Sequence, residues 1–268
     1  MRLIFLLLTC LLAHAASAQT VTERNFKKHF EAYGLRGSFL LLDAQANRYT
    51  AYDAQRCRQG FLPASTFKIP NTLLGLETGV IRDTSQVMKW DGITRNFAQW
   101  NQNMTLANAL RVSCVPCYQQ VARGIGARRY NEWLPRLRFG KMVVAEATVD
   151  TFWLAGPSRI TQFEQIDFLR RLYANQLPVS VQHQQTTRQL LLLKKTPAYQ
   201  LHGKTGWTWH DRLHSNGWFV GWVQRADGRV YFFALNAEPQ PGQPADDKFV
   251  RGRRAITENI LAELRITD

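Results

Sequence analysis

The sequence predicts an α+β fold in which one antiparallel sheet, built from both ends of the chain and flanked by helices, carries an inserted all-helical lobe. Strand-like segments lie near both termini, the periodicity between them is mostly helical, and no internal repeat or linker separates the parts. The 268 residues are 45% hydrophobic and 20% charged, which fits a compact globular chain and excludes a disordered one. We expect a cleft at the seam between the sheet and the lobe.

The first eighteen residues are typical of an export signal. Met1-Arg2 supplies a positive start, an almost unbroken apolar run follows, and Ala16-Ser17-Ala18 has small residues where signal peptidase cleaves. We therefore expect a signal peptide over 1–18, a single domain over 19–268, a periplasmic mature chain and no membrane anchor after cleavage. A lipoprotein processed at Cys10 is the alternative, although Thr9 stands where such a signal carries a small residue.

The remaining elements are expected in the following order. A short amphipathic helix covers 21–33, and a hairpin follows from two strand-like segments joined by a turn-rich stretch, at 37–42 and 49–52. Helical periodicity then extends from 66 to about 195. Three strands come next, at 199–208, 217–225 and 229–236. A tight turn at 226–228 joins the last two. A helix over 249–264 closes the chain. From this order of elements, we expect a sheet subdomain over about 19–65 and 196–268 and a helical subdomain over about 66–195.

The charge balance is strongly basic. The chain has 34 Lys and Arg against 20 Asp and Glu, a formal net charge of +14. Such an excess favours anionic partners such as nucleic acid or a membrane surface. No nucleic-acid motif accompanies it, so we expect no nucleic-acid partner.

Three cysteines remain after cleavage, and their odd number leaves at least one thiol unpaired within the chain. Cys114 and Cys117 have the C-x-x-C spacing of redox and zinc motifs. No second cysteine pair or nearby histidine completes a metal site. We interpret these two cysteines as small buried residues near a helix start, and the redox states of Cys57, Cys114 and Cys117 stay open.

Ser65 and Lys68 form the single S-x-x-K of the chain, at a point where Pro63 and an apolar run indicate a helix start. Residues three apart share a helix face, so the two side chains lie together near free backbone N–H groups. A serine needs a base to take its proton, and a lysine serves only if its pKa is depressed. Apolar burial does this, with Phe67, Val115 and Trp153 as candidate pocket walls.

Two further elements strengthen this interpretation. Lys204-Thr205-Gly206 falls inside a predicted strand, where a glycine indicates close approach by a ligand or another backbone. A lysine and a hydroxyl beside that glycine can hold a carboxylate. Ser113 adds another hydroxyl at a helix start within the lobe. S-x-x-K followed by K-T-G is the signature of serine β-lactamases and penicillin-binding proteins.

The chain resembles the class D, oxacillinase-type β-lactamases over essentially its whole mature length. The landmarks are PASTFKIPNTLLGLETGVI, the Ser113-x-Val115 element, DTFWL, HGKTGW and GWFVGWV, at 63–81, 113–115, 150–154, 202–207 and 217–223. Class A enzymes would instead carry a Ser-Asp-Asn element and a catalytic glutamate. The resemblance implies hydrolysis of β-lactam antibiotics, with no cofactor beyond the carbon dioxide that carboxylates a lysine.

The resemblance also implies roles for single residues. Ser65 is the nucleophile, Lys68 becomes N6-carboxylysine and acts as general base, and Ser113 relays a proton. Trp153 holds the lysine carbamate, and the backbone N–H of Trp207 completes the oxyanion hole with that of Ser65. Val115 and Leu154 line the site. The substrate is bound by Lys204, Thr205, Gly206 and Arg253.

One triplet departs from the family pattern. Phe139-Gly140-Lys141 stands where the family usually has Tyr-Gly-Asn. Because the tyrosine version is associated with inhibition by chloride, we expect this chain to be relatively insensitive to chloride. We expect Lys141 to point outward, since lysine is seldom buried.

His210 and His214 frame an acid in an H-x-x-x-H pattern that suggests a zinc pair. They fall in a predicted loop, and two ligands do not make a site, so we expect solvated histidines and no metal.

Two other functions use the same serine and lysine. A penicillin-binding sensor or a transpeptidase would also be acylated, but neither would release the acyl group quickly. The expected partner is a small β-lactam, and the chain is expected to be a monomer or a homodimer. The substrate range, carbapenems included, depends on loop conformation that the sequence does not define.

Overall fold

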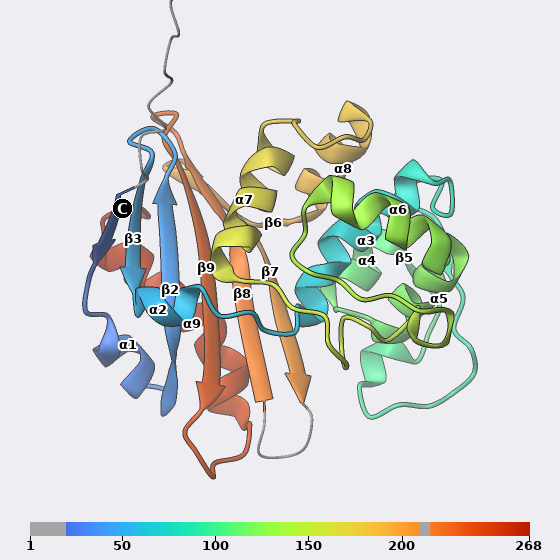
Figure 1. Ribbon diagram of the computed structural model, residues 1–268, viewed down its shortest axis with the longest axis horizontal. Helices are drawn as coiled ribbons and strands as arrows, with labels where there is room; N and C mark the ends of the chain where they lie inside the picture. The colour runs from blue at the N-terminus through green and yellow to red at the C-terminus, as the bar shows by residue number, and fades with distance from the viewer. Residues whose placement is uncertain (1–19, 210–214) are drawn as a thin grey trace, which may run out of the picture.

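The computed structural model describes residues 20–209 and 215–268, and its main feature is a seven-stranded sheet (Figure 1). The strand order is β1-β3-β2-β9-β8-β7-β6. The strands are Val21–Glu23 (β1), Leu35–Asp43 (β2), Arg48–Tyr52 (β3), Leu192–Lys195 (β6), Tyr199–Trp209 (β7), Ser215–Arg225 (β8) and Val230–Pro239 (β9). β2 pairs antiparallel with β9, which confirms that the two ends of the chain share one sheet.

The strand predictions in the C-terminal part are confirmed. β7, β8 and β9 form an antiparallel meander. The turn between β8 and β9 is closed by a hydrogen bond from Gly228 N to Arg225 O at 3.1 Å. The hairpin of β2 and β3 and the closing helix, Asp247–Glu263 (α9), are also present. The expected signal peptide and both histidines of the H-x-x-x-H pattern lie outside the described residues.

The helix predicted over 21–33 is wrong in its first part. Val21–Glu23 forms β1, which runs parallel to β3 with Val21 opposite Tyr49. The helix α1 covers only Lys27–Glu31. The segment becomes a strand because it pairs with an edge that lies later in the chain, and local apolar spacing carries no record of such a long-range partner.

Helices cover both faces of the sheet (Figure 1). On one face, α1 and α9 enclose an apolar cluster that includes Phe26, Phe39, Phe233 and Ile256, all fully buried. On the other face lie the helix Gln162–Tyr173 (α7) and the inserted lobe. Gln162 is also fully buried and donates from Nε2 to the carbonyl of Ala234 on β9, at 2.5 Å, so α7 is tied to the sheet.

The lobe contains most of the helices. They are Lys68–Glu77 (α3), Leu106–Arg111 (α4), Val115–Ile125 (α5), Ala127–Leu137 (α6) and Val181–Leu190 (α8). A two-stranded sheet pairs Val87–Met88 (β4) with Met104–Thr105 (β5). The short helix Ala54–Cys57 (α2) lies outside the lobe and contacts β2. The described residues also form 3-10 turns at Ala64–Phe67 (η1), Ala98–Trp100 (η2) and Glu146–Thr148 (η3). β6 returns the chain to the sheet from Leu192 onward.

The expectation that the C-x-x-C pair is buried near a helix start is confirmed, and the structure settles the redox state that the sequence left open. Cys114 and Cys117 are both buried at the start of α5, and a disulfide joins them. They are the N-cap and the third residue of that helix, so one helical turn brings their side chains together. The expected free thiol is Cys57, and burial raises its pKa to about 12.

Candidate active site

The S-x-x-K pair forms the centre of the site. Ser65 lies in η1, Lys68 begins α3, and Lys68 Nζ donates to Ser65 Oγ at 2.7 Å. Ala64 precedes them with a φ of +53°, a left-handed conformation that is uncommon for a residue with a Cβ. Its N–H donates to the carbonyl of Trp153 at 2.9 Å. The turn that presents Ser65 is therefore held by backbone contact with a distant segment.

Lys68 is a lysine without exposed surface. Burial lowers its pKa well below the usual value, and the nearby charge of Lys204 lowers the pKa further. The ring of Tyr118 lies 5.4 Å from Lys68 Nζ. An amine in these surroundings is neutral more readily than a lysine in water, and only the neutral form accepts a proton from a hydroxyl.

Trp153 lies against the same turn. Its ring stacks on that of Phe67, with centroids 5.4 Å apart, and the residue is fully buried. Its indole Nε1 has no hydrogen-bond partner among the described residues. Because buried donors are nearly always paired in native proteins, this N–H is suited to a ligand or a modified side chain.

The K-T-G strand forms the other wall. Lys204 on β7 donates from Nζ to Ser113 Oγ at 3.0 Å, which brings the sheet and the lobe together. Burial, with a smaller effect of Arg253, lowers the pKa of Lys204 to about 7. A Cβ on Gly206 would lie 3.3 Å from Ala64 Cβ, so this glycine allows η1 to approach β7 closely. The expected reason for a glycine inside the strand is confirmed.

Arg253 reaches this strand from α9. It is 6% exposed, and its Nη1 donates to the carbonyl of Gly206 at 2.5 Å. Burial lowers its pKa to about 10. Its guanidinium lies 5.8 Å from the ring of Trp207, and half-buried Thr205 precedes this pair of β7 residues.

The two remaining predicted residues, Val115 and Leu154, are neighbours in the chain of residues already described. Val115 is the first residue of α5 and lies one turn before Tyr118, the residue beneath Lys68. Leu154 follows Trp153 directly and packs, half-buried, against the apolar core. The structure thus brings together segments from both ends of the chain and from the lobe.

The comparisons with known proteins agree with this arrangement. The family described as "Penicillin binding protein transpeptidase domain" matches residues 16–262. The chain is 37% identical to β-lactamase OXA-5 of Pseudomonas aeruginosa over 253 residues, 93% of this chain and 92% of that one. The chain belongs to the class D β-lactamases. It is also 37% identical to β-lactamase OXA-48 of Klebsiella pneumoniae, covering 98% of this chain and 96% of that one.

Solved structures of other class D β-lactamases have the same fold as this one. The crystal structure of a class D β-lactamase from Nostoc superposes with a TM-score of 0.85 at 36% identity, covering 90% of this chain and 98% of that one. FUS-1 (OXA-85) from Fusobacterium nucleatum subsp. polymorphum gives 0.83 at 33% identity, covering 91% and 98%. The enzyme is a serine hydrolase that acts on β-lactams.

The family departure lies beside the nucleophile turn of this β-lactamase. Phe139 is fully buried, and its ring packs edge-on against Phe67 at 5.8 Å and Phe168 at 4.8 Å. It therefore fills space with a hydrocarbon ring and offers no hydroxyl. Lys141 is exposed, which confirms the expectation that it points outward.

The sequence did not identify several residues that support the enzyme's site. Gln165 on α7 donates to Thr66 Oγ1 at 2.8 Å, directly beside the nucleophile. Tyr118 pairs its hydroxyl with Thr72 at 2.6 Å, and its carbonyl accepts from Asn71. These are ordinary residue types without a spacing signature, so only the folded chain identifies them.

The C-x-x-C spacing was the one available sequence signal for the disulfide beside Ser113. Among the described residues, no group of three or more His, Cys, Asp or Glu side chains could hold a metal ion. No described helix is both long and apolar enough to cross a membrane.

Proposed function

We propose that the enzyme opens β-lactams through an acyl-enzyme on Ser65, with Lys68 carboxylated by carbon dioxide. The observation that carries this proposal is the fully buried Lys68 Nζ, which lies 2.7 Å from Ser65 Oγ. Burial depresses the lysine pKa, and a neutral amine is the form that reacts with carbon dioxide.

The surroundings of Lys68 fit a carboxyl group on its amine. Trp153 Nε1 is a buried donor whose partner is missing among the described residues. The nearby cations Lys204 and Arg253 are also buried, so an added negative charge would be stabilised. A carboxyl group on Lys68 Nζ would supply a base that accepts a proton and becomes neutral, whereas a free amine would become a buried ammonium.

The placement of the described side chains supports the following course of acylation. Ser65 Oγ attacks the lactam carbonyl, the O–C bond forms, and the hydroxyl proton passes to the Lys68 side chain. The C–N bond of the lactam then breaks, Ser113 delivers its hydroxyl proton to the leaving nitrogen, and the proton that the Lys68 side chain took from Ser65 replaces it on Ser113. The backbone N–H groups of Ser65 and Trp207 stabilise the developing oxyanion.

Substrate binding depends on the K-T-G side of the site. Lys204, Thr205 and Arg253 hold the carboxylate of the substrate, while Gly206 lets the strand approach η1. Val115 and Leu154 supply apolar walls that limit access of water to Lys68. In deacylation, the Lys68 side chain takes a proton from a water that attacks the ester, the C–O bond to Ser65 breaks, and Lys68 passes that proton to Ser65 Oγ.

Carbon dioxide removal tests the proposal. We expect turnover of a penicillin to fall by about tenfold or more in carbon dioxide-free buffer and to recover with bicarbonate. Intact-mass spectrometry of a rapidly quenched reaction should show Ser65 carrying one opened penicillin. An unchanged rate without carbon dioxide would refute the lysine modification.

The same mass measurement separates the alternatives. An acyl-enzyme that forms and then persists for hours would instead support a penicillin-binding sensor or a transpeptidase. A β-lactamase should show the acylated mass only while substrate remains.

We also propose that the mature enzyme is periplasmic, supported by the signal-like residues 1–18. Expression of the full chain in a Gram-negative host, followed by osmotic release, should yield a protein that begins after Ala18. Retention of the intact N-terminus in the cytoplasm would refute this location. The monomer and the homodimer are to be distinguished by the mass in solution.

A further inference from the structure

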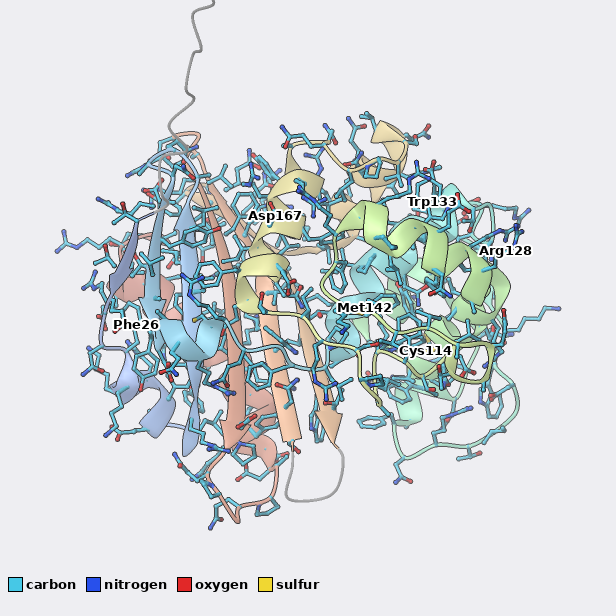
Figure 2. The ribbon with its side chains drawn as sticks, in the orientation of Figure 1. Phe26, Cys114, Arg128, Trp133, Met142 and Asp167 are labelled. Atoms are coloured by element: carbon cyan, nitrogen blue, oxygen red, sulfur yellow. A yellow bond between two sulfur atoms is a disulfide. The ribbon has the colours of Figure 1, made fainter. Side chains whose placement is uncertain are left out.

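The Cys114–Cys117 disulfide lies directly after Ser113 and spans the first turn of α5. Cys114 is the N-cap of the helix, and its sulfur accepts a hydrogen bond from Cys117 N at 3.2 Å. N-caps are usually Ser, Thr, Asp or Asn, whose oxygen makes this bond reversibly. Here a covalent link holds the same two positions. Figure 2 shows Cys114 within the helical lobe.

Ser113 occupies a connection that needs such support. Its φ is +55°, a left-handed conformation that residues with a Cβ rarely adopt. The N–H of Ser113 donates to Leu110 O at 3.2 Å and that of Cys114 to Ala109 O at 2.8 Å, which ends α4. Ser113 thus lies at the bend between α4 and α5, and the disulfide fixes the first turn of α5.

The position of this bend decides a contact in the site. Ser113 Oγ accepts from Lys204 Nζ at 3.0 Å, across the seam between lobe and sheet. Further along α5, Tyr118 is anchored to α3 by its own bonds to Thr72 and Asn71. The wall beneath Lys68 therefore has independent support, whereas the disulfide acts at the end of α5 that carries Ser113.

We propose that the Cys114–Cys117 disulfide is a positioning element that holds Ser113 in register with Lys204. This inference rests on the proposed role of Ser113 as the proton relay of acylation. Loss of the disulfide slows acylation, because the relay oxygen is less well placed, and has little effect on deacylation, which uses Lys68 and Trp153. If the disulfide only stabilised the fold, its loss would lower the amount of folded enzyme and would not slow acylation more than deacylation.

Reduction of the native enzyme is the first arm of the test. A trialkylphosphine and one water convert the disulfide to two thiols and a phosphine oxide, and the protein gains two hydrogen atoms in mass. Single-turnover acylation by a chromogenic β-lactam should slow by about tenfold, as expected when a catalytic group is misplaced. Deacylation, followed after removal of excess substrate, should change by less than about twofold.

Variants make the test independent of reductant access, since Cys114 is fully buried and Cys117 only 6% exposed. The pair Cys114→Ser with Cys117→Ala keeps a hydroxyl N-cap but removes the link, and we expect the same slow acylation without any response to phosphine. The pair Cys114→Ala with Cys117→Ala should be slower still. Cys57→Ala is the matched control, because it removes a buried cysteine outside the link and should retain native acylation and its sensitivity to reduction.

The outcomes separate this inference from the proposed function. Counting sites with a fluorescent penicillin corrects each rate for misfolded protein. If the serine-capped pair acylates at the native rate, the positioning role is refuted while the acyl-enzyme stands. Equal loss in acylation and deacylation also refutes it. Absence of any acyl-enzyme in the native protein would instead refute the proposed function.

Discussion

Three cations of the site are buried in one region of the molecule, and this decides its chemistry at the scale of single residues. Lys68, Lys204 and Arg253 are all at least nine-tenths buried, and no ion pair joins any of them to a carboxylate within the described part of the chain. Burying unpaired charge is costly, so such groups lose protons or acquire partners. The lowered pKa of each of the two lysines has burial as its main cause.

The indole of Trp153 provides a residue-scale prediction. In Trp153→Phe the ring can still stack on Phe67, but the unpaired Nε1–H is lost. If that donor holds a carboxyl group on Lys68, kcat should fall by about 10²-fold, the usual cost of removing one donor from a charge-stabilising site. Acyl-enzyme should accumulate, and high bicarbonate should restore part of the rate.

A second tryptophan supplies the control. Trp222 on β8 is 1% exposed, its Nε1 also lacks a partner among the described residues, and its ring stacks on His202 at 4.6 Å. We expect Trp222→Phe to keep kcat within about twofold. If both variants lose activity equally, packing rather than the site donor explains the Trp153 result.

The pKa of Lys204 predicts a pH dependence of substrate selection. This amine has a pKa of about 7, so it is charged below that pH and increasingly neutral above it. We expect kcat/KM for a penicillin, relative to kcat/KM for its methyl ester, to fall as pH rises through about 7. The ratio cancels effects of Lys68 that both substrates share. A ratio that stays constant from about pH 6 to 9 would show that Lys204 does not attract the carboxylate electrostatically.

Short sequence spacings explain which site residues could be predicted. Ser65 and Lys68 are three apart, and one helical step brings them together whatever the rest of the chain does. Gln165 reaches Thr66 from α7, far along the sequence, and nothing in its local context indicates that contact. The C-x-x-C spacing was informative, but burial alone does not distinguish two thiols from a disulfide.

At the scale of elements, α7 supports the nucleophile turn through its N-terminal end. Thr161 Oγ1 accepts from Glu164 N at 3.1 Å, and Glu164 Oε2 accepts from Thr161 N at 2.8 Å, which is a capping box. Gln165, the residue after Glu164, donates a hydrogen bond to Thr66 Oγ1. The cap therefore stabilises the helix that packs behind Ser65.

Thr161→Ala tests this cap. We expect a loss of about 1 kcal/mol in the free energy of unfolding, seen as a drop in Tm of about 2–4 °C. Thr161→Ser retains the accepting oxygen and should recover most of that loss. Equal destabilisation by serine and alanine would assign the effect to the threonine methyl group instead.

The elements also differ in how well local sequence predicts them. β7, β8 and β9 are rich in aromatic residues and Val, and a recognisable turn joins β8 to β9, so their bounds were close to those expected. β1 has only three residues and exists because β3 offers it an edge. Its pairing is a property of the folded sheet, which is why local spacing indicated a helix.

At the scale of the whole molecule, the site forms only when distant parts of the chain meet. η1 comes from the first third of the sequence, β7 and α9 from the last, and Ser113 from the inserted lobe. The sheet order places the N-terminal strands beside β9, so the two ends of the chain lie in the same sheet as β7, the strand that carries Lys204. The sequence could predict this architecture from element order, but not the depth at which each cation is buried.

Burial of Lys68 should reduce the stability of the whole enzyme, and this cost should depend on pH. The unfolded amine keeps its proton up to a pH of about 10.4, whereas the folded amine loses it far lower. Between those values the unfolded chain binds more protons, so the stability of the native sequence rises with pH. Lys68→Met fills the pocket with an apolar side chain and has no such dependence.

We therefore expect Lys68→Met to be inactive yet more stable, with Tm higher by about 3 °C or more at neutral pH in carbon dioxide-free buffer. The Tm difference should shrink as the pH approaches about 10, because the unfolded native chain then no longer gains by protonating this amine. Shared groups that do not contact Lys68, such as Cys57, cancel in the comparison. Lys141→Met, at an exposed lysine, should show no comparable gain. A variant at Lys68 that is less stable at neutral pH, or a Tm difference that grows with pH, would contradict a depressed lysine pKa and with it the basis for the base at this site.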